Sequence, residues 1–230
     1  LSRYIRAKIY FCLKDKKYDE AVKFAKIGLK IGDTLKDEPI LISQLTRFAI
    51  DITIMESVNS ILNVKGIKIS ENDYIEILSI LNEKETGIDK ALNGEMVIFG
   101  KPIFLGNYPR ELFLCLSTGL RYNKFYKIIN AIYLPVIKND FIFYSKYFSN
   151  IIELSKKPYY LAKTDIENLE NSHLKIYSNR FISIKHIYTA LITPTFKGCT
   201  IQKEKHFAYV DTLKIVIGLK IYKQKYGKYP

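Results

Sequence analysis

Apolar residues recur at steps of three and four positions through most of this 230-residue chain. That spacing places them on one face of an α-helix, because a helix completes a turn in about 3.6 residues. The clearest case is 202–226, where the apolar positions are Phe207, Val210, Leu213, Ile217 and Ile221. Gly227 follows at the position of a C-terminal cap. We predict a mainly α protein, built as a multi-helix bundle or as an irregular helical array.

The N-terminal segment 2–34 predicts a helical hairpin. Asp19 is a candidate cap for its second helix. Small residues on one face of that helix, at Ala21, Ala25 and Gly28, allow a neighbouring helix to approach closely. The hairpin resembles a tetratricopeptide unit, but no second copy follows at the period of about 34 residues that such repeats require. We therefore expect one tetratricopeptide-like hairpin and no solenoid.

Capping and proline signals predict further helices between this hairpin and the C-terminal helix. Pro39 fits the first turn of a helix that runs to about residue 62, because its missing N–H would be unpaired there anyway. Ser70 begins a capping signal for the next helix. Pro135 is expected to kink or end a helix. Other helical segments are expected from 139 to a stop at Pro158, over the polar surface stretch 165–173, and over 181–191.

The segment 94–109 interrupts the helical pattern. Two short apolar runs, at 96–99 and 103–105, flank a turn that contains Gly100 and Pro102. This arrangement predicts a β-hairpin or an extended flap, although proline weakens a strand pair because it has no N–H to donate. No low-complexity linker divides the chain. We therefore expect one domain over 1–230, with at most one short β-hairpin.

The formal net charge of +13 raises the question of an anionic partner. Of the 36 basic residues, 30 are lysine and six are arginine. Arginine supplies the bidentate contacts that nucleic-acid interfaces favour, and a lysine-rich composition also follows from an AT-rich genome. We therefore place protein ahead of nucleic acid or an anionic membrane surface as the partner. The charge-free stretches are shorter than the roughly 20 residues that a bilayer requires, so we expect no transmembrane segment in this piece.

Histidines offer the main candidate catalytic chemistry. Glu170 and His173 have the ExxH spacing of a metal-binding helix, but a di-metal bundle needs a second such motif, and the sequence has none. We predict a solvated surface helix there. His186 and His206 are each expected to be hydrogen-bonded histidines near apolar segments, and Asp51 a helix-surface acid. No cofactor and no metal are predicted, and whether the protein is an enzyme stays open.

Five residues are candidate partner-binding positions. Lys23, Lys26 and Lys30 recur at helical spacing on the polar side of the second helix. Tyr159 and Tyr160 are adjacent, and tyrosine combines a large contact area with a polar tip, which suits an interface. The alternative for the tyrosines is that aromatic residues fill a core that contains no tryptophan.

Two stretches resemble a group of uncharacterised bacterial helical proteins, many of them membrane-anchored. The first is the EPxLISQL-type segment at 38–45, which follows the tetratricopeptide-like hairpin in those proteins too. The second is the C-terminal helix that ends in the GxYP pattern at 227–230. The resemblance implies a helical fold and carries no established activity. The chain begins at Leu1, so we expect a piece of a longer protein, and the resemblance implies that this protein is anchored outside the cytoplasm.

These patterns favour a non-enzymatic helical module for protein interaction or scaffolding, as an accessory subunit of a larger assembly. One alternative is a hydrolase-type enzyme with a histidine-containing cleft. Another is a basic surface that binds nucleic acid or anionic lipid. Two histidines with carboxylates in one deep pocket would favour the enzyme, and a lysine stripe would favour the anionic partner. An exposed apolar or aromatic patch would favour the interaction module.

Overall fold

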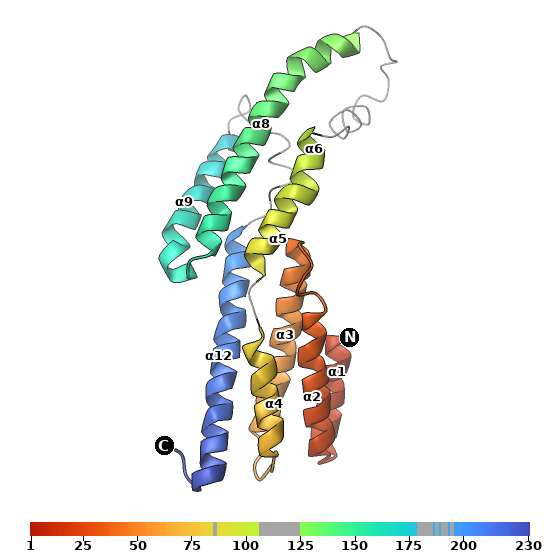
Figure 1. Ribbon diagram of the computed structural model, residues 1–230, viewed down its shortest axis with the longest axis vertical. Coiled ribbons are helices and arrows are strands. Elements are labelled where there is room, and N and C mark those ends of the chain that lie inside the picture. Colours follow the sequence, from red (N-terminus) through yellow and green to blue (C-terminus); the bar gives the residue numbers. More distant parts are fainter. Residues whose placement is uncertain (85–86, 106–124, 179–185, 187–188, 190–192, 194–195) are drawn as a thin grey trace. The chain divides into compact units, whose positions relative to one another are not determined.

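The computed structural model describes residues 1–84, 87–105, 125–178, 186, 189, 193 and 196–230. Among these residues the regular elements are all helices and no strand is present, which confirms the mainly α prediction (Figure 1). The elements are α1 (Ser2–Lys14), α2 (Tyr18–Asp33), α3 (Leu41–Leu62), α4 (Glu71–Asn82), α5 (Ile88–Glu95), the π-helix η1 (Met96–Gly100), α6 (Lys101–Leu105), α8 (Phe125–Ser155), α9 (Tyr159–Ser178) and α12 (Phe196–Tyr226).

The chain divides into two compact units. Unit 1 comprises 1–38, 42–87 and 201–230, and unit 2 comprises 39–41 and 88–200. Compactness alone does not decide whether two units of one chain unfold together. The single domain expected over 1–230 therefore stays a prediction.

The predicted N-terminal hairpin is confirmed by α1 and α2, which are joined by a tight turn. Lys16 adopts a φ of 57° in this turn, and the N–H of Lys17 donates to the carbonyl of Cys12 at 2.8 Å, which closes the end of α1. The prediction that Asp19 caps α2 is wrong. Lys17 is the capping residue, without a side-chain hydrogen bond, and Asp19 lies in the first turn, where its charge favours the helix dipole.

The small face of α2 lets α3 approach closely, as the sequence predicted. A Cβ added to Gly28 would lie 2.8 Å from Cδ1 of Ile54, and one added to Gly32 would lie 2.2 Å from Oδ1 of Asp51. Both distances are shorter than ordinary van der Waals contact. Glycine at these two positions therefore brings the backbone of α2 directly against side chains of α3.

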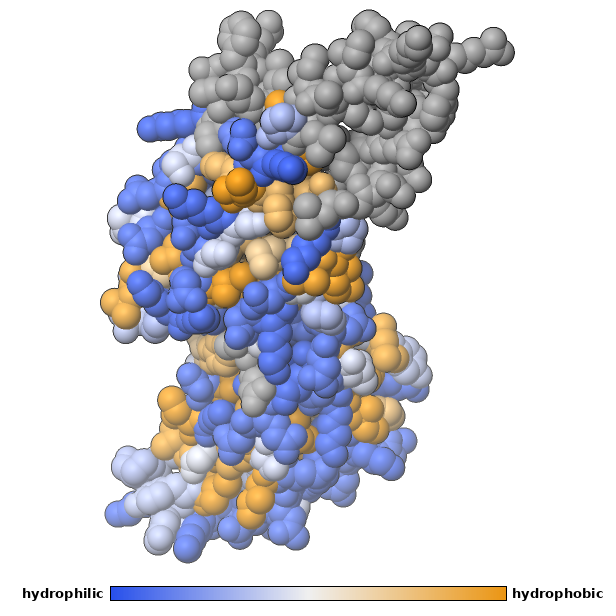
Figure 2. Space-filling model, turned by 45° about the horizontal axis from the view of Figure 1, so that its top comes forward, coloured by the Kyte–Doolittle hydropathy of each residue, from blue (hydrophilic) through white to orange (hydrophobic). Residues whose placement is uncertain are grey.

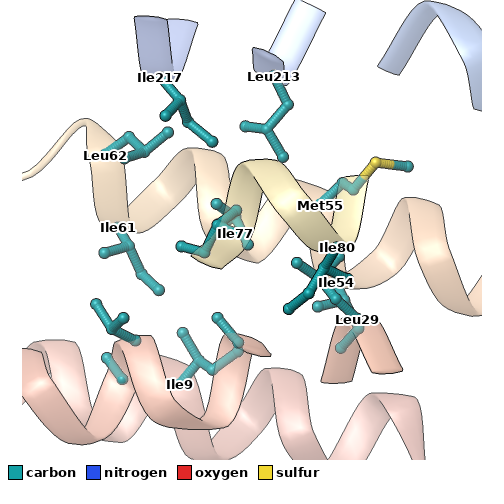
Figure 3. Close-up of a cluster of buried hydrophobic side chains, with 14 of the residues drawn as sticks. Ile9, Leu29, Ile54, Met55, Ile61, Leu62, Ile77, Ile80, Leu213 and Ile217 are labelled. Carbon is teal, nitrogen blue, oxygen red and sulfur yellow. The ribbon is translucent and has the colours of Figure 1, made fainter. Parts of the chain in front are cut away.

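The apolar core of unit 1 takes residues from α1, α2, α3, α4 and α12. Leu213 and Ile217 of α12 point into this core, toward Ile77 of α4 and Leu62 of α3 (Figure 3). Val210 is buried on the same face of α12. The buried face predicted within 202–226 is thus confirmed, although α12 begins earlier than predicted.

Two of the helix ends predicted from capping and proline signals are confirmed and one is shifted. The Oγ of Ser70 accepts a hydrogen bond from the N–H of Asp73 at 3.1 Å, which caps α4. Gly227 has a φ of +76°, and its N–H donates to the carbonyl of Lys223 at 2.8 Å, which ends α12. Pro39 lies just before α3 instead of in its first turn.

The β-hairpin or flap predicted over 94–109 is wrong over 96–105, where the chain is helical. Pro102 lies in α6, directly after the π-helix η1. Gly100 is needed for packing, because a Cβ there would lie 2.3 Å from the ring of Tyr144. Residues 106–109 of the predicted flap lie outside the described residues.

Unit 2 changes two further helix predictions. Pro135 does not end a helix, because it lies inside α8, and a proline removes one helical hydrogen bond without forcing a long helix to end. The kink predicted as the alternative stays a prediction. The polar stretch 165–173 is helical as predicted, within α9, but His173 in it is buried. Most of the helix predicted over 181–191 lies outside the described residues.

None of the helices in the described ranges is both long enough and apolar enough to cross a membrane. This agrees with the prediction of no transmembrane segment.

Candidate functional site

A group of charged and polar side chains is buried inside unit 1. We call it the polar cluster, and its members are Asp33, Arg47, Asp51, Lys84 and His206. Asp33 is partly exposed, whereas the other four side chains are fully buried. The cluster joins α2, α3 and α12 to the residues that follow α4. A buried charge is costly unless it is paired and hydrogen-bonded, so the partners of each member decide what the cluster can do.

Lys84 has a partner for each of its three ammonium protons. Its Nζ donates to the carbonyl of Leu29 at 2.6 Å, to Oδ1 of Asp33 at 2.7 Å and to Oδ1 of Asp51 at 3.0 Å. An ammonium group has three donors and no acceptor, so these contacts use its full capacity. Lys84 is therefore a well-paired buried cation.

Asp51 connects this lysine to α12. Its Oδ2 lies 3.0 Å from Nε2 of His206, whose ring centroid lies 4.7 Å from that of Phe48. The prediction that His206 is hydrogen-bonded is confirmed. The prediction that Asp51 is a surface acid is wrong, because its side chain is 0% exposed. The contact with α2 at Gly32 and the pairing with Lys84 explain why this carboxylate is inside.

Arg47 and Gln44 extend the polar cluster toward the α2–α3 connection. Nη1 of Arg47 donates to Oε1 of Gln44 at 3.3 Å, and Nη2 lies 3.9 Å from Oδ1 of Asp33. The Nε2 of Gln44 lies within 2.8 to 3.1 Å of three backbone carbonyls, those of Leu35, Lys36 and Glu38. Gln44 thereby holds the connection against α3.

The charges of the polar cluster balance, with Arg47 and Lys84 opposite Asp33 and Asp51. Asp51 and His206 resemble an acid–base pair, but both are fully buried. A general base has to lie within hydrogen-bond reach of the proton that it takes from a substrate. The arrangement therefore suits a structural network that fixes how α12 packs on α3.

Two of the three histidines lie together in unit 2. His173 and His186 both approach Phe143, with ring centroids 5.9 and 4.5 Å away, and His173 also stacks on Tyr147 at 4.2 Å. Burial, together with the charge of His186, lowers the pKa of His173 to about 4. His173 is thus a neutral ring in an aromatic stack near pH 7, and the predicted solvated position is wrong.

Asp140 is a carboxylate beside His186. Its Oδ1 lies 3.4 Å from Nδ1 of His186, and the hydroxyl and N–H of Thr189 both donate to the Asp140 carboxylate. Glu170, the acid of the ExxH motif, accepts a hydrogen bond from the N–H of Lys197 at 2.8 Å. Among the described residues no three metal-ligating side chains gather in one place. Asp140 therefore bonds to Thr189 as well as lying beside His186.

Among the described residues of unit 2, Cys199 is a buried cysteine and a candidate nucleophile. Burial raises the pKa of the Cys199 thiol to about 11, so the group stays protonated at neutral pH. A thiolate is the form of cysteine that attacks a substrate. Cys199 therefore has the surroundings of a structural cysteine.

The three lysines predicted to bind a partner lie on α2 beside α4. Nζ of Lys26 donates to Asp73 at 2.8 Å and to Glu76 at 2.7 Å, and these hydrogen bonds raise the pKa of Lys26. Lys30 lies 3.8 Å from Glu76, whereas Lys23 is exposed. Lys26 thus helps to join α2 to α4, and the partner-binding role of these lysines stays a prediction.

The two tyrosines predicted at an interface begin α9 in unit 2. Tyr160 is exposed and Tyr159 is half-buried. A partner role for this pair also stays a prediction.

A row of exposed apolar residues runs along the second half of α12. We call it the apolar stripe, and it comprises Ile215 (64% exposed), Leu219 (37%), Tyr222 (38%) and Tyr226 (57%). These residues recur at steps of four, three and four, so they share one side of the helix. Ile215 lies two residues from Leu213, a rotation of about 200° around the helix axis. The apolar stripe is therefore on the side of α12 opposite to the core.

The surroundings of the apolar stripe are basic. From residue 211 onward the chain carries five lysines and one acid, Asp211. Lys223 and Lys225 are exposed, and Lys214 is partly exposed. On the face of the molecule drawn in Figure 2, hydrophobic residues form small separate patches among hydrophilic ones.

No protein-family model, curated protein or solved structure matches this chain. The resemblance to membrane-anchored bacterial helical proteins therefore stays a prediction.

Proposed function

We propose that this protein is a helical interaction module that binds an amphipathic helix of a partner protein along the apolar stripe of α12. The observation that carries the proposal is the continuous exposure of four apolar side chains over three turns of one helix. Removing apolar surface from water is favourable by about 25 cal/mol per Å². A partner helix with apolar residues at the same spacing would cover the stripe, as amphipathic helices do in apolar grooves.

The lysines beside the apolar stripe indicate the charge of that partner. Lys214 and Lys225 lie on one side of the stripe, and Lys223 lies on the other, by their positions around the helix. A partner with acidic residues beside its apolar positions would be attracted, and complementary charge raises association rates as well as specificity. A second copy of α12 would place lysines against lysines, which disfavours self-association.

The buried acid–base groups favour this proposal over a hydrolase. In unit 1, Asp51 and His206 are fully buried and bonded to each other. In unit 2, the hydroxyl of Thr189 donates to the carboxylate of Asp140, which is 1% exposed and lies beside His186. A catalytic base has to reach the substrate, whereas the residues of the apolar stripe are already exposed.

A synthetic peptide tests the proposal directly. The peptide is an amphipathic helix with leucine at the spacing of the apolar stripe and glutamate on both flanks, and its binding to the full chain is measured by fluorescence anisotropy. We expect the double variant Ile215→Ser, Leu219→Ser to weaken binding by at least about tenfold, or about 1.4 kcal/mol. The control is Ile75→Ser, which changes a residue that is 53% exposed on α4 and should leave binding unchanged.

Three outcomes would overturn the proposal. Equal binding by the double variant would show that the apolar stripe is not the contact surface. Equal binding by a peptide with lysine in place of glutamate would contradict the acidic partner. A dimer in sedimentation equilibrium that the double variant abolishes would make a second copy of this chain the occupant.

A further inference from the structure

A cavity of about 740 Å³ lies in unit 1, at the α3–α4 connection and the end of α12. Its lining residues come from two stretches of chain, 63–74 and 220–227. Gly66, with a φ of +77°, turns the connection, and a Cβ added there would meet nothing within 4 Å. The cavity falls within the range of about 300 to 1,000 Å³ that is usual for small-molecule sites.

The charge of this cavity is entirely positive. Lys65, Lys68, Lys220 and Lys223 line it, and none of its lining residues is acidic. None of these four lysines forms an ion pair within the described part of the chain, in contrast to Lys26, which bonds to two carboxylates. Four like charges around one cavity repel each other, and an anion placed among them would relieve that repulsion.

The remaining lining residues add neutral polar groups and an apolar wall. Asn63 and Gln224 carry side-chain amides, and Ile67 and Ile69 are apolar. Tyr74 lines the cavity as a buried residue, and burial raises the pKa of its hydroxyl, which therefore keeps its proton as a hydrogen-bond donor. The cavity thus offers donors together with fixed positive charge.

A second cavity, of about 600 Å³, shares Gly66 and Lys68 with the first. It adds Lys16 and Lys17, but Asp19 and Glu20 also line it. Acidic residues in its wall make the second cavity less suited to an anion. The first cavity, where lysine is the only charged residue type, is therefore the stronger candidate.

We propose that the first cavity binds a ligand with two or more phosphate groups. Lysine ammonium groups contact phosphate oxygens as compact point charges, and four of them match a ligand of several negative charges. A soluble polyphosphorylated compound and the headgroup of a phosphorylated lipid share this chemistry. Lys223 lines this cavity and also flanks the apolar stripe. Lys65 and Lys68 lie outside α12, so changes at these two lysines test the cavity separately from the stripe.

Binding of sodium tripolyphosphate to the full chain tests the proposal, measured by isothermal titration calorimetry at near-physiological salt. We expect Lys65→Gln, Lys68→Gln to weaken binding by at least about tenfold. The control is Arg3→Gln, Lys8→Gln, which removes the same charge from exposed positions of α1. The control should change the affinity by less than about threefold, because exposed charges farther than about 8 Å are screened at this salt.

Vesicles distinguish the two sources of phosphate. Phosphatidylcholine vesicles with and without phosphatidylinositol bisphosphate are sedimented with the chain, and tripolyphosphate is added as competitor. If the chain sediments only with vesicles that contain the phosphorylated lipid, and tripolyphosphate releases it, the ligand is a lipid headgroup. If the chain binds tripolyphosphate but not these vesicles, the ligand is a soluble compound. The proposal would be overturned if the chain bound neither tripolyphosphate nor the vesicles. It would also be overturned if Lys65→Gln, Lys68→Gln and the control Arg3→Gln, Lys8→Gln lost the same amount of affinity. Neither Lys65 nor Lys68 lies on α12, so Lys65→Gln, Lys68→Gln should leave binding in the peptide assay unchanged.

Discussion

Leu213 and Ile215 are two residues apart in α12, and their surroundings differ. Leu213 is 3% exposed and lies in the core of unit 1, whereas Ile215 is 64% exposed. The difference extends along the helix, because Ile217 is buried one turn after Leu213, and Leu219 is exposed one turn after Ile215. α12 therefore has two apolar sides, of which the fold uses one.

The buried side of α12 has a polar part as well as an apolar part. His206 precedes Val210 and Leu213 on this side, and it bonds to Asp51 of α3. Apolar contacts are tolerant of small shifts, whereas a buried hydrogen bond between charged or polar groups requires one geometry. The polar cluster thus favours one orientation of α12, and that orientation leaves the apolar stripe exposed.

The largest effect is expected from Asp51→Ala. The substitution removes the carboxylate that bonds His206 and leaves Lys84 with Asp33 as its remaining acidic partner among the described residues. Loss of one partner of a buried ion pair costs about 3–5 kcal/mol. The free energy of unfolding is measured by urea denaturation. Asp211→Ala is the matched control, because Asp211 is exposed on α12 and its loss should change stability by less than about 0.5 kcal/mol. Equal effects of the two changes would contradict a buried network.

A comparison of Leu213→Ala with Ile215→Ala separates the two sides of α12. Truncation of the buried leucine should lower the free energy of unfolding by about 2–5 kcal/mol, because it removes apolar contacts and leaves a cavity. Truncation of the exposed isoleucine should change it by less than about 0.5 kcal/mol. Thermal and urea denaturation of both variants give the two values. Similar losses would mean that the exposed side also supports the fold.

Smaller changes in the free energy of unfolding, one a decrease and one an increase, are expected from alanine substitutions at two glycines. Gly32→Ala places a Cβ against the Asp51 carboxylate, and overpacking of this kind costs about 1–3 kcal/mol. Gly218→Ala places a Cβ in α12 where nothing lies within 4 Å, so it should raise stability by about 0.5–1 kcal/mol through helix propensity. Destabilisation by both alanines would contradict the open surroundings of Gly218.

The sequence allowed the fold class and several elements to be predicted because their signals are local. Apolar spacing located the α1–α2 hairpin and the buried side of α12, and the Ser70 cap located the start of α4. The prediction of a flap was wrong because it depended on packing. Gly100 and Pro102 resemble turn residues in sequence, but Gly100 permits a close contact with Tyr144, and Pro102 lies within the helix α6.

The polar cluster could be predicted only in part. Gln44, Arg47 and Asp51 recur at steps of three and four and continue into the buried Ile54, so their shared face was present in the sequence. The partner Lys84 lies 33 positions from Asp51 and looks like any surface lysine. Pairing over such a distance depends on how the helices pack. The exposure of the apolar stripe depends on packing in the same way.

Stability and peptide binding, measured together for a buried-side variant and an exposed-side variant, test most directly whether the two sides of α12 have separate roles. Unfolding in urea and binding of the glutamate-flanked peptide are measured for Leu213→Ala and for Ile215→Ser, Leu219→Ser. We predict that Leu213→Ala lowers stability and that its folded fraction binds the peptide as the unsubstituted chain does. We predict that the double variant keeps its stability and loses binding by about tenfold or more. A double variant that is destabilised as strongly as Leu213→Ala, or that still binds the peptide, would contradict the separation of the two sides.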